Sequence, residues 1–81
     1  MTPKYFMDEK PIYGNNNIKT WWIINEYNEE FGWINERDNK IISGNFLGRD
    51  LNPIKVVNDP EIQRLCPDLV NFMYIYLVHH G

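Results

Sequence analysis

The pattern of hydrophobic and polar positions along the chain changes at about residue 58. Before that point, short runs of aromatic and β-branched residues alternate with turn-forming residues, which is typical of antiparallel strands. After it, apolar residues recur at steps of three and four, which is typical of a helix with an apolar face. The pattern therefore predicts an α+β fold, in which a small antiparallel meander of three to four strands packs against a C-terminal helix.

The strongest strand signal lies at residues 20–27, with the sequence TWWIINEY. Bulky aromatic and β-branched side chains suit a pleated sheet, and they lose rotamer freedom in a helix. A helix is the alternative for this segment, because apolar residues between Ile18 and Ile34 also fit helical spacing in part. We favour the strand.

Turn-forming residues mark the rest of the meander. A turn at residues 28–32 and a tight turn at Asp38-Asn39 follow the first strand, because asparagine, aspartate and glycine tolerate left-handed backbone conformations. Further strands are expected at residues 33–37, 40–46 and, as a short fourth strand, 54–57.

The 81 residues are expected to form a single domain, 1–81, because so short a chain rarely builds two cores. A hydrophobic fraction of 43% argues against disorder. Within the domain we expect an irregular N-terminal arm (1–19), the β-meander (20–57) and a helical C-terminal part (59–80). Proline, glycine and three consecutive asparagines punctuate the arm, and a short edge strand at residues 5–7 is the alternative there.

The helical part has a clear start and a clear interruption. Asp59 suits an N-cap and Pro60 suits the first helical position, whereas Pro67 is expected to kink or break the helix. Beyond the break the apolar residues line one face. They are Leu65, Leu69, Phe72, Met73, Tyr76 and Leu77. Other apolar residues widen this face almost all round, so we expect the helix to lie in a core or in an interface.

The net charge of −3 is concentrated in one acidic run. The run comprises Glu26, Glu29, Glu30, Glu36 and Asp38. A protein that binds DNA or RNA directly would show a basic stripe instead, so we expect no direct nucleic-acid binding. The run is either a solvated hairpin edge or a patch that meets a basic partner surface.

No constellation for catalysis or for a metal stands out. Cys66 is 13 and 14 residues from His79 and His80, about 20 Å along a straight helix, whereas a nucleophile and its base must be in contact. The glutamates offer carboxylate pairs, but so small a chain leaves little room for a cleft. Residues 44–49 lack the spacing of a phosphate-binding loop. We therefore expect no catalytic residue, no metal site and no cofactor.

The tryptophans are the most informative feature. Trp21 and Trp22 are neighbours, so in a strand they point to opposite faces, and one helical layer covers only one face. Exposed tryptophan and tyrosine favour a protein–protein contact, whereas cover by the arm would make both residues structural. The residues that we expect to bind a partner are Trp22, Glu26, Tyr27, Glu29, Glu30, Phe31, Trp33 and Glu36.

These features favour a small non-catalytic module that binds another protein, such as an inhibitor or adaptor. The frequent asparagine, isoleucine, lysine and tyrosine are typical of an AT-rich genome, such as that of a low-GC bacterium or its phage. The alternative is a small-molecule or nucleotide-binding domain that stacks a ring on a tryptophan and meets an anion with Arg37 or Arg49. A homodimer through the C-terminal helix is a third hypothesis.

A cytoplasmic location is expected. The single cysteine cannot form an internal disulfide, and the first residues lack the apolar stretch of a signal peptide. The longest apolar stretch, residues 72–78, is too short to cross a membrane, which takes roughly 20 residues.

Overall fold

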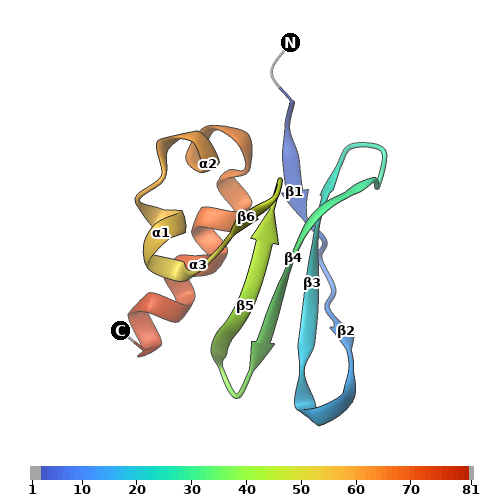
Figure 1. The fold of residues 1–81 in the computed structure, drawn as a ribbon, viewed down its shortest axis with the longest axis vertical. Coiled ribbons are helices and arrows are strands. Elements are labelled where there is room, and N and C mark those ends of the chain that lie inside the picture. Colours follow the sequence, from blue (N-terminus) through green and yellow to red (C-terminus); the bar gives the residue numbers. More distant parts are fainter. Residues whose placement is uncertain (1–2, 81) are drawn as a thin grey trace.

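A computed structural model describes residues 3–80 of the chain, with side chains up to Val78. It is an α+β fold, as predicted, in which three helices lie on one side of an antiparallel sheet (Figure 1). The elements are β1 (Tyr5–Met7), β2 (Ile12–Tyr13), a 3-10 helix η1 (Asn15–Asn17), β3 (Lys19–Asn25), β4 (Glu30–Arg37), β5 (Lys40–Phe46), β6 (Arg49–Asp50), α1 (Pro53–Val57), α2 (Pro60–Leu65) and α3 (Pro67–His80).

The predicted meander forms the centre of the sheet. The strand order is β1-β3-β4-β5-β6, and β2 also pairs with β3. Asp38 and Asn39 have positive φ angles of 52° and 66°, so the β4–β5 connection is a tight turn of the mirror-image type that suits the twist of a hairpin. This turn was predicted. The next connection repeats the geometry at Leu47 and Gly48, with φ angles of 51° and 81°.

The expected turn at residues 28–32 is shorter than predicted, because β4 already begins at Glu30. Gly32 is therefore a strand residue, buried opposite Ile23. A Cβ added at Gly32 would clash with the carbonyl oxygen of Asn45. The glycine thus allows β4 and β5 to approach closely, and it does not supply a turn conformation.

The N-terminal arm is part of the sheet. Residues 5–7 pair with Ile23–Asn25, and residues 12–13 pair with Lys19 and Thr20, both antiparallel. The prediction of an irregular arm over 1–19 was therefore wrong for these two strands, whereas the alternative of an edge strand at residues 5–7 was right. The arm pairs because β3 would otherwise be an unprotected edge.

The expected fourth strand at residues 54–57 was wrong, because these residues belong to helix α1. Asn52 is the reason. Its side chain accepts a hydrogen bond from the backbone N–H of Lys55 at 2.9 Å, and Pro53 occupies the first helical turn. The short helix buries Val56 completely, so the pattern that resembled a strand serves a helix instead.

The other helix boundaries were predicted correctly. The Asp59 side chain accepts hydrogen bonds from the backbone N–H groups of Glu61 and Ile62 at the start of α2. Pro67 separates α2 from α3, and Cys66 before it lies outside the helical region, with φ −146° and ψ 77°. The residue before a proline is driven out of the helical region by steric clash.

The helices and one face of the sheet enclose a single apolar cluster. Its buried members are Tyr5, Ile23, Ile34, Phe46, Leu51, Val56, Ile62, Leu65, Cys66, Leu69, Val70 and Met73. Five of them come from strands or the strand-to-helix connection, six come from helices, and Cys66 lies between α2 and α3, so neither layer folds around a core of its own. The other face of the sheet carries the candidate site.

Candidate functional site

The two faces of the sheet differ in what covers them. Trp21 points to the helices, where its ring centroid lies 5.3 Å from that of Phe72 on α3. Trp22 points to the opposite face, which carries none of the three helices (Figure 1). Trp22 lies directly opposite Trp33 in the β3–β4 register, so both tryptophans share this open face. Both side chains are half-buried.

Apolar residues of neighbouring strands extend this surface. Ile24 follows Trp22 on the same face, Phe6 lies opposite Ile24 on β1, and Ile12 comes from β2. Ile12 is 58% exposed. Two carboxylates, Asp8 and Glu30, line a hollow of about 190 Å³ together with Trp22, Ile24, Ile12 and Asn28. We call this surface the open-face site, and its members are Phe6, Asp8, Ile12, Trp22, Ile24, Glu30 and Trp33.

Polar side chains border the open-face site along the middle strands. The hydroxyl of Thr20 donates to the side-chain oxygen of Asn35 at 2.8 Å, and the Asn35 amide lies 3.4 Å from the Ser43 hydroxyl. This line of hydrogen-bonded groups crosses from β3 to β5. The open face is thus apolar at one end and polar towards the other.

The acidic groups gather at the β3–β4 end of the sheet. A second hollow, of about 540 Å³, is lined there by Asp8, Glu9, Glu26 and Asp68, with Lys10 as the one basic residue in its lining. It shares Asp8, Ile24 and Asn28 with the smaller hollow, so the two adjoin. A basic group that approaches the tryptophans from this end therefore meets several carboxylates.

The turn that carries Glu26 and Glu29 is fixed by Asn25. The side-chain oxygen of Asn25 accepts from the backbone N–H groups of Tyr27 and Glu29, at 2.9 and 3.0 Å. Its amide nitrogen donates to the Glu29 carboxylate at 2.8 Å. Tyr27 stands at the tip and is 75% exposed. Four predicted residues, Glu26, Tyr27, Glu29 and Glu30, therefore lie at one end of the sheet, and Glu30 is the one that lines the smaller hollow with Trp22.

Phe31 does not join Trp22 and Trp33. A bulge in β4 between the Ile23 and Ile24 pairs turns its ring towards Tyr5, with 5.1 Å between the ring centroids. Tyr5 is a core residue that also contacts Phe46. Phe31 therefore borders the covered face, although it is 36% exposed.

Glu36 also lies apart from the other predicted residues. It is 5% exposed on the covered face, where the Tyr76 hydroxyl donates to its carboxylate at 3.3 Å and the Lys19 ammonium lies 4.0 Å away. Burial, together with the nearby Glu36 charge, raises the pKa of Tyr76 to about 12, so the phenol stays a donor at neutral pH. The structure thus splits the acidic run, because Glu30 and Glu36 lie about 20 Å apart along β4.

Sequence reasoning missed Asp8, Ile12 and Ile24 as members of this surface. Ile24 could have been found, because it shares the alternation that places Trp22 on the open face. Asp8 and Ile12 belong to the arm, and they reach the site only because the arm pairs with β3. The backbone N–H of Asp8 donates to the Trp22 carbonyl at 2.9 Å, which fixes the carboxylate beside the tryptophan.

The residues that we considered for catalysis, metal binding or anion binding are Cys66, His79, His80, Arg49 and the acidic side chains. Cys66 is fully buried, and burial raises the pKa of its thiol to about 11, so at neutral pH it is not a thiolate nucleophile. The side chains of His79 and His80 lie outside the described part of the chain. Within residues 3–78 no group of three histidine, cysteine or acidic side chains is placed to hold a metal ion. Arg49 forms ion pairs with Asp59 and Glu61.

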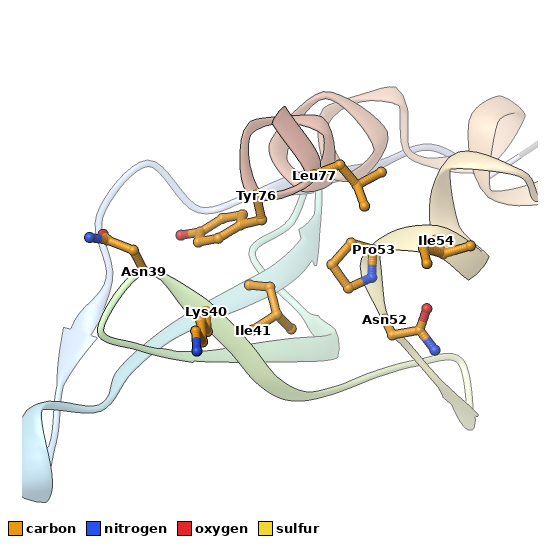
Figure 2. A pocket seen from close by; sticks show the side chains of 8 residues that line it. All are labelled: Asn39, Lys40, Ile41, Asn52, Pro53, Ile54, Tyr76 and Leu77. Atoms are coloured by element: carbon orange, nitrogen blue, oxygen red, sulfur yellow. The ribbon is translucent and has the colours of Figure 1, made fainter. Parts of the chain in front are cut away.

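A third hollow lies on the helical side, between the β4–β5 turn, α1 and the end of α3 (Figure 2). It measures about 470 Å³, and its wall is mainly apolar. In Figure 2, Leu77 points towards Pro53, with Ile54 beside it on α1, and the ring of Tyr76 extends towards Asn39. None of the predicted site residues lines it.

No described helix is both long and apolar enough to cross a membrane. The chain was compared with models of protein families, with curated proteins and with solved structures, and none of them matches it.

Proposed function

We propose that the chain is a protein-binding module that occupies a partner's surface with its open-face site. One observation supports the proposal above the others: two tryptophans lie side by side on an uncovered sheet face, next to the carboxylates of Asp8 and Glu30. Aromatic side chains are enriched at the energetic centres of protein interfaces, because they bury a large area with few rotatable bonds.

The arrangement suits a partner that presents a basic side chain. An arginine or lysine that enters the smaller hollow would lay its aliphatic stem on Trp22 and Ile24 and bring its charge to Asp8 and Glu30. A cation over a tryptophan ring contributes about 0.5–2 kcal/mol, and an ion pair sheltered by the ring gains more than an exposed one. The other carboxylates at this end of the sheet would steer the partner at longer range.

In this proposal the module acts by occupying or bridging a surface, as an inhibitor or an adaptor does, without chemistry of its own and without direct contact to nucleic acid. The net charge of −3 suits a basic protein surface, including the groove of an enzyme that itself binds nucleic acid. We also propose a cytoplasmic site of action, because the only cysteine is a free thiol in the core.

The experiment is affinity capture from a lysate of the cells that produce the protein. Wild type is compared with Trp22→Ala and with Tyr13→Ala, a control in which an aromatic residue that is 73% exposed lies outside the open-face site. We expect wild type and Tyr13→Ala to retain the same protein, and Trp22→Ala to lose it while keeping its circular dichroism spectrum. Retention by Trp22→Ala at wild-type level would contradict the proposal.

A second set of variants addresses the charge. Reversal at Glu29 and Glu30 to lysine should weaken capture, and it should remove most of the dependence of binding on salt concentration. The matched control is Asp50→Lys, which changes the charge by the same amount per residue on the far edge of the sheet. Equal binding by the reversed and wild-type proteins would rule out the acidic groups as part of the contact.

A further inference from the structure

The outward face of α3 is a second exposed apolar surface, separate from the open-face site. Tyr74, Ile75 and Val78 are 51%, 56% and 77% exposed. With Asn71 they occupy positions i, i+3, i+4 and i+7, which lie on one side of a helix. Their opposite side, with Leu69 and Met73, is completely buried. An outward helix face is ordinarily polar, so an exposed apolar stripe indicates contact with another molecule.

The stripe continues onto α1. Ile54, which is 65% exposed, and Leu77 both line the hollow of about 470 Å³ between α1, α3 and the β4–β5 turn (Figure 2). Pro53 and Ile41 contribute to the same wall. The apolar area available on this side of the molecule therefore extends beyond one helix, into a concave region that can receive a side chain from a neighbour.

The charge distribution indicates which partner fits. Residues 69–78 contain no aspartate, glutamate, lysine or arginine, although the chain as a whole carries −3. Two copies that meet through residues 69–78 bring no like charges together there, and the nearest cations are Lys40 in the lining of the hollow and Lys55 on α1. Contact through the acidic end of the open face would instead oppose several carboxylates. The uncharged stripe can thus pack against a second copy of itself without charge repulsion. It has no charged side chain that could pair with a strongly charged partner.

The spacing is also self-complementary. A stripe at i, i+3, i+4 and i+7 can pack against an identical antiparallel stripe across a twofold axis, because every contact between two different residues then occurs twice and only residues near the axis meet their own counterpart. A standard interface buries about 800 Å² per partner. That is roughly one-seventh of the 5551 Å² that this chain exposes, so a standard contact has to extend from the outer side of α3 onto the neighbouring part of α1.

We propose that two copies of this chain associate through the outward faces of α3, with Ile54 at the margin of the contact. This inference goes beyond the proposed function, because it concerns the opposite side of the molecule. α3 lies on the covered face of the sheet, so a dimer formed there leaves both open-face sites free and directed outwards (Figure 1). Such a dimer is bivalent, and it binds a repeated or dimeric partner more tightly than one copy does.

The test is the molar mass in solution, measured by sedimentation equilibrium over concentrations from about 1 µM to about 1 mM, the range in which modest interfaces dissociate. We expect the mass of wild type to rise with concentration from 9.7 kDa towards twice that value. Ile75→Glu should remain at 9.7 kDa throughout. The matched control is Ile12→Glu, which places the same charge on an isoleucine that is 58% exposed in the open-face site, and it should still dimerise.

Two results would overturn the inference. One is a wild type that stays at 9.7 kDa over the whole range, which would mean that the stripe meets another molecule or none. The other is a dimer that Ile12→Glu abolishes and Ile75→Glu preserves, which would locate the contact on the open face. Neither result bears on partner capture, because Ile75→Glu leaves the open-face site intact and should still retain the partner.

Discussion

The two faces of the sheet carry adjacent residues of the same strand in opposite environments. Ile23 is completely buried beneath the helices, whereas Ile24 is half-buried on the open face. Trp21 packs on Phe72, whereas Trp22 lies beside the carboxylates of the open-face site. The covered face therefore stabilises the fold, because it buries apolar area at about 25 cal/mol per Å². The open face contributes less to the fold, and it is the face that we propose to contact a partner.

The largest expected effect tests this division with two neighbouring isoleucines. Ile23→Ala removes a core side chain and leaves a cavity, so we expect a loss of about 2–5 kcal/mol in the free energy of unfolding. Ile24→Ala should lose about 1 kcal/mol or less, because its side chain is already in contact with water. Urea unfolding measures both. Equal losses would mean that the faces do not differ as described.

Two glycines differ in how much space surrounds them. Gly32→Ala introduces a Cβ against the Asn45 carbonyl, between two paired strands that cannot separate without breaking the sheet. We expect a loss of about 1–3 kcal/mol in unfolding free energy. In Gly14→Ala the nearest atom is the Ile18 carbonyl oxygen at 3.6 Å, an ordinary contact, so the change should be small. Thermal unfolding of both variants measures the two losses in stability. A Gly32→Ala variant that is as stable as wild type would contradict the close approach of β4 and β5.

Alkaline pH is expected to lower the free energy of unfolding, because two titratable groups lie on the covered face. Burial raises the pKa of Cys66 from 9.0 to about 11, and that of Tyr76 from 10.0 to about 12. Both groups are neutral when protonated, and the folded state favours this neutral form. Their contribution to the free energy of unfolding is therefore complete below pH 9 and is lost as pH rises towards 12. The loss should be on the order of 2 kcal/mol for Cys66, which is fully buried, and smaller for Tyr76, because water reaches its side chain in part.

Urea unfolding at pH 8, 10 and 11 measures this decline. Tyr76→Phe, which cannot ionise, should show a shallower decline than wild type, although it gives up the hydrogen bond to Glu36 at neutral pH. A stability that stays constant up to pH 11 would show that these two groups are not sheltered from water.

The smallest effect concerns the helical layer that covers one face. Asn52→Ala removes the side chain that caps α1, so we expect a loss of about 1 kcal/mol in unfolding free energy. Asn71→Ala is the control, because Asn71 is an exposed residue inside α3 and its replacement should change stability by no more than about 0.5 kcal/mol. If the two variants unfold alike, the cap does not hold the start of α1.

The sequence predicted the features that depend on neighbouring residues. The opposite directions of Trp21 and Trp22 follow from strand alternation, the Asp38-Asn39 turn from its residue types, and the break at Pro67 from sterics. Burial of Glu36 was within reach of the same reasoning. Alternation from Trp33 places Glu36 on the face opposite the tryptophan, and its position in an acidic run suggested solvent instead.

Features that depend on distant residues were mostly not predicted, the edge strand at residues 5–7 being the exception as an alternative. The arm joins the sheet because β3 offers it an edge, and no local pattern at residues 12–13 signals that pairing. Residues 54–57 fit a strand as well as a helix, and the cap from Asn52 together with burial of Val56 decided between them. Phe31 moved to the covered side through a bulge, which shifts the register of all later positions.

We propose that the open face, and not the covered face, contacts the partner. The three indole N–H groups report on it directly in the ¹⁵N NMR spectrum, because Trp22 and Trp33 lie on the open face and Trp21 beneath α3. On titration with the captured partner, we predict that the Trp22 and Trp33 signals shift or broaden while the Trp21 signal stays in place. Binding that leaves both open-face signals unmoved would contradict the account.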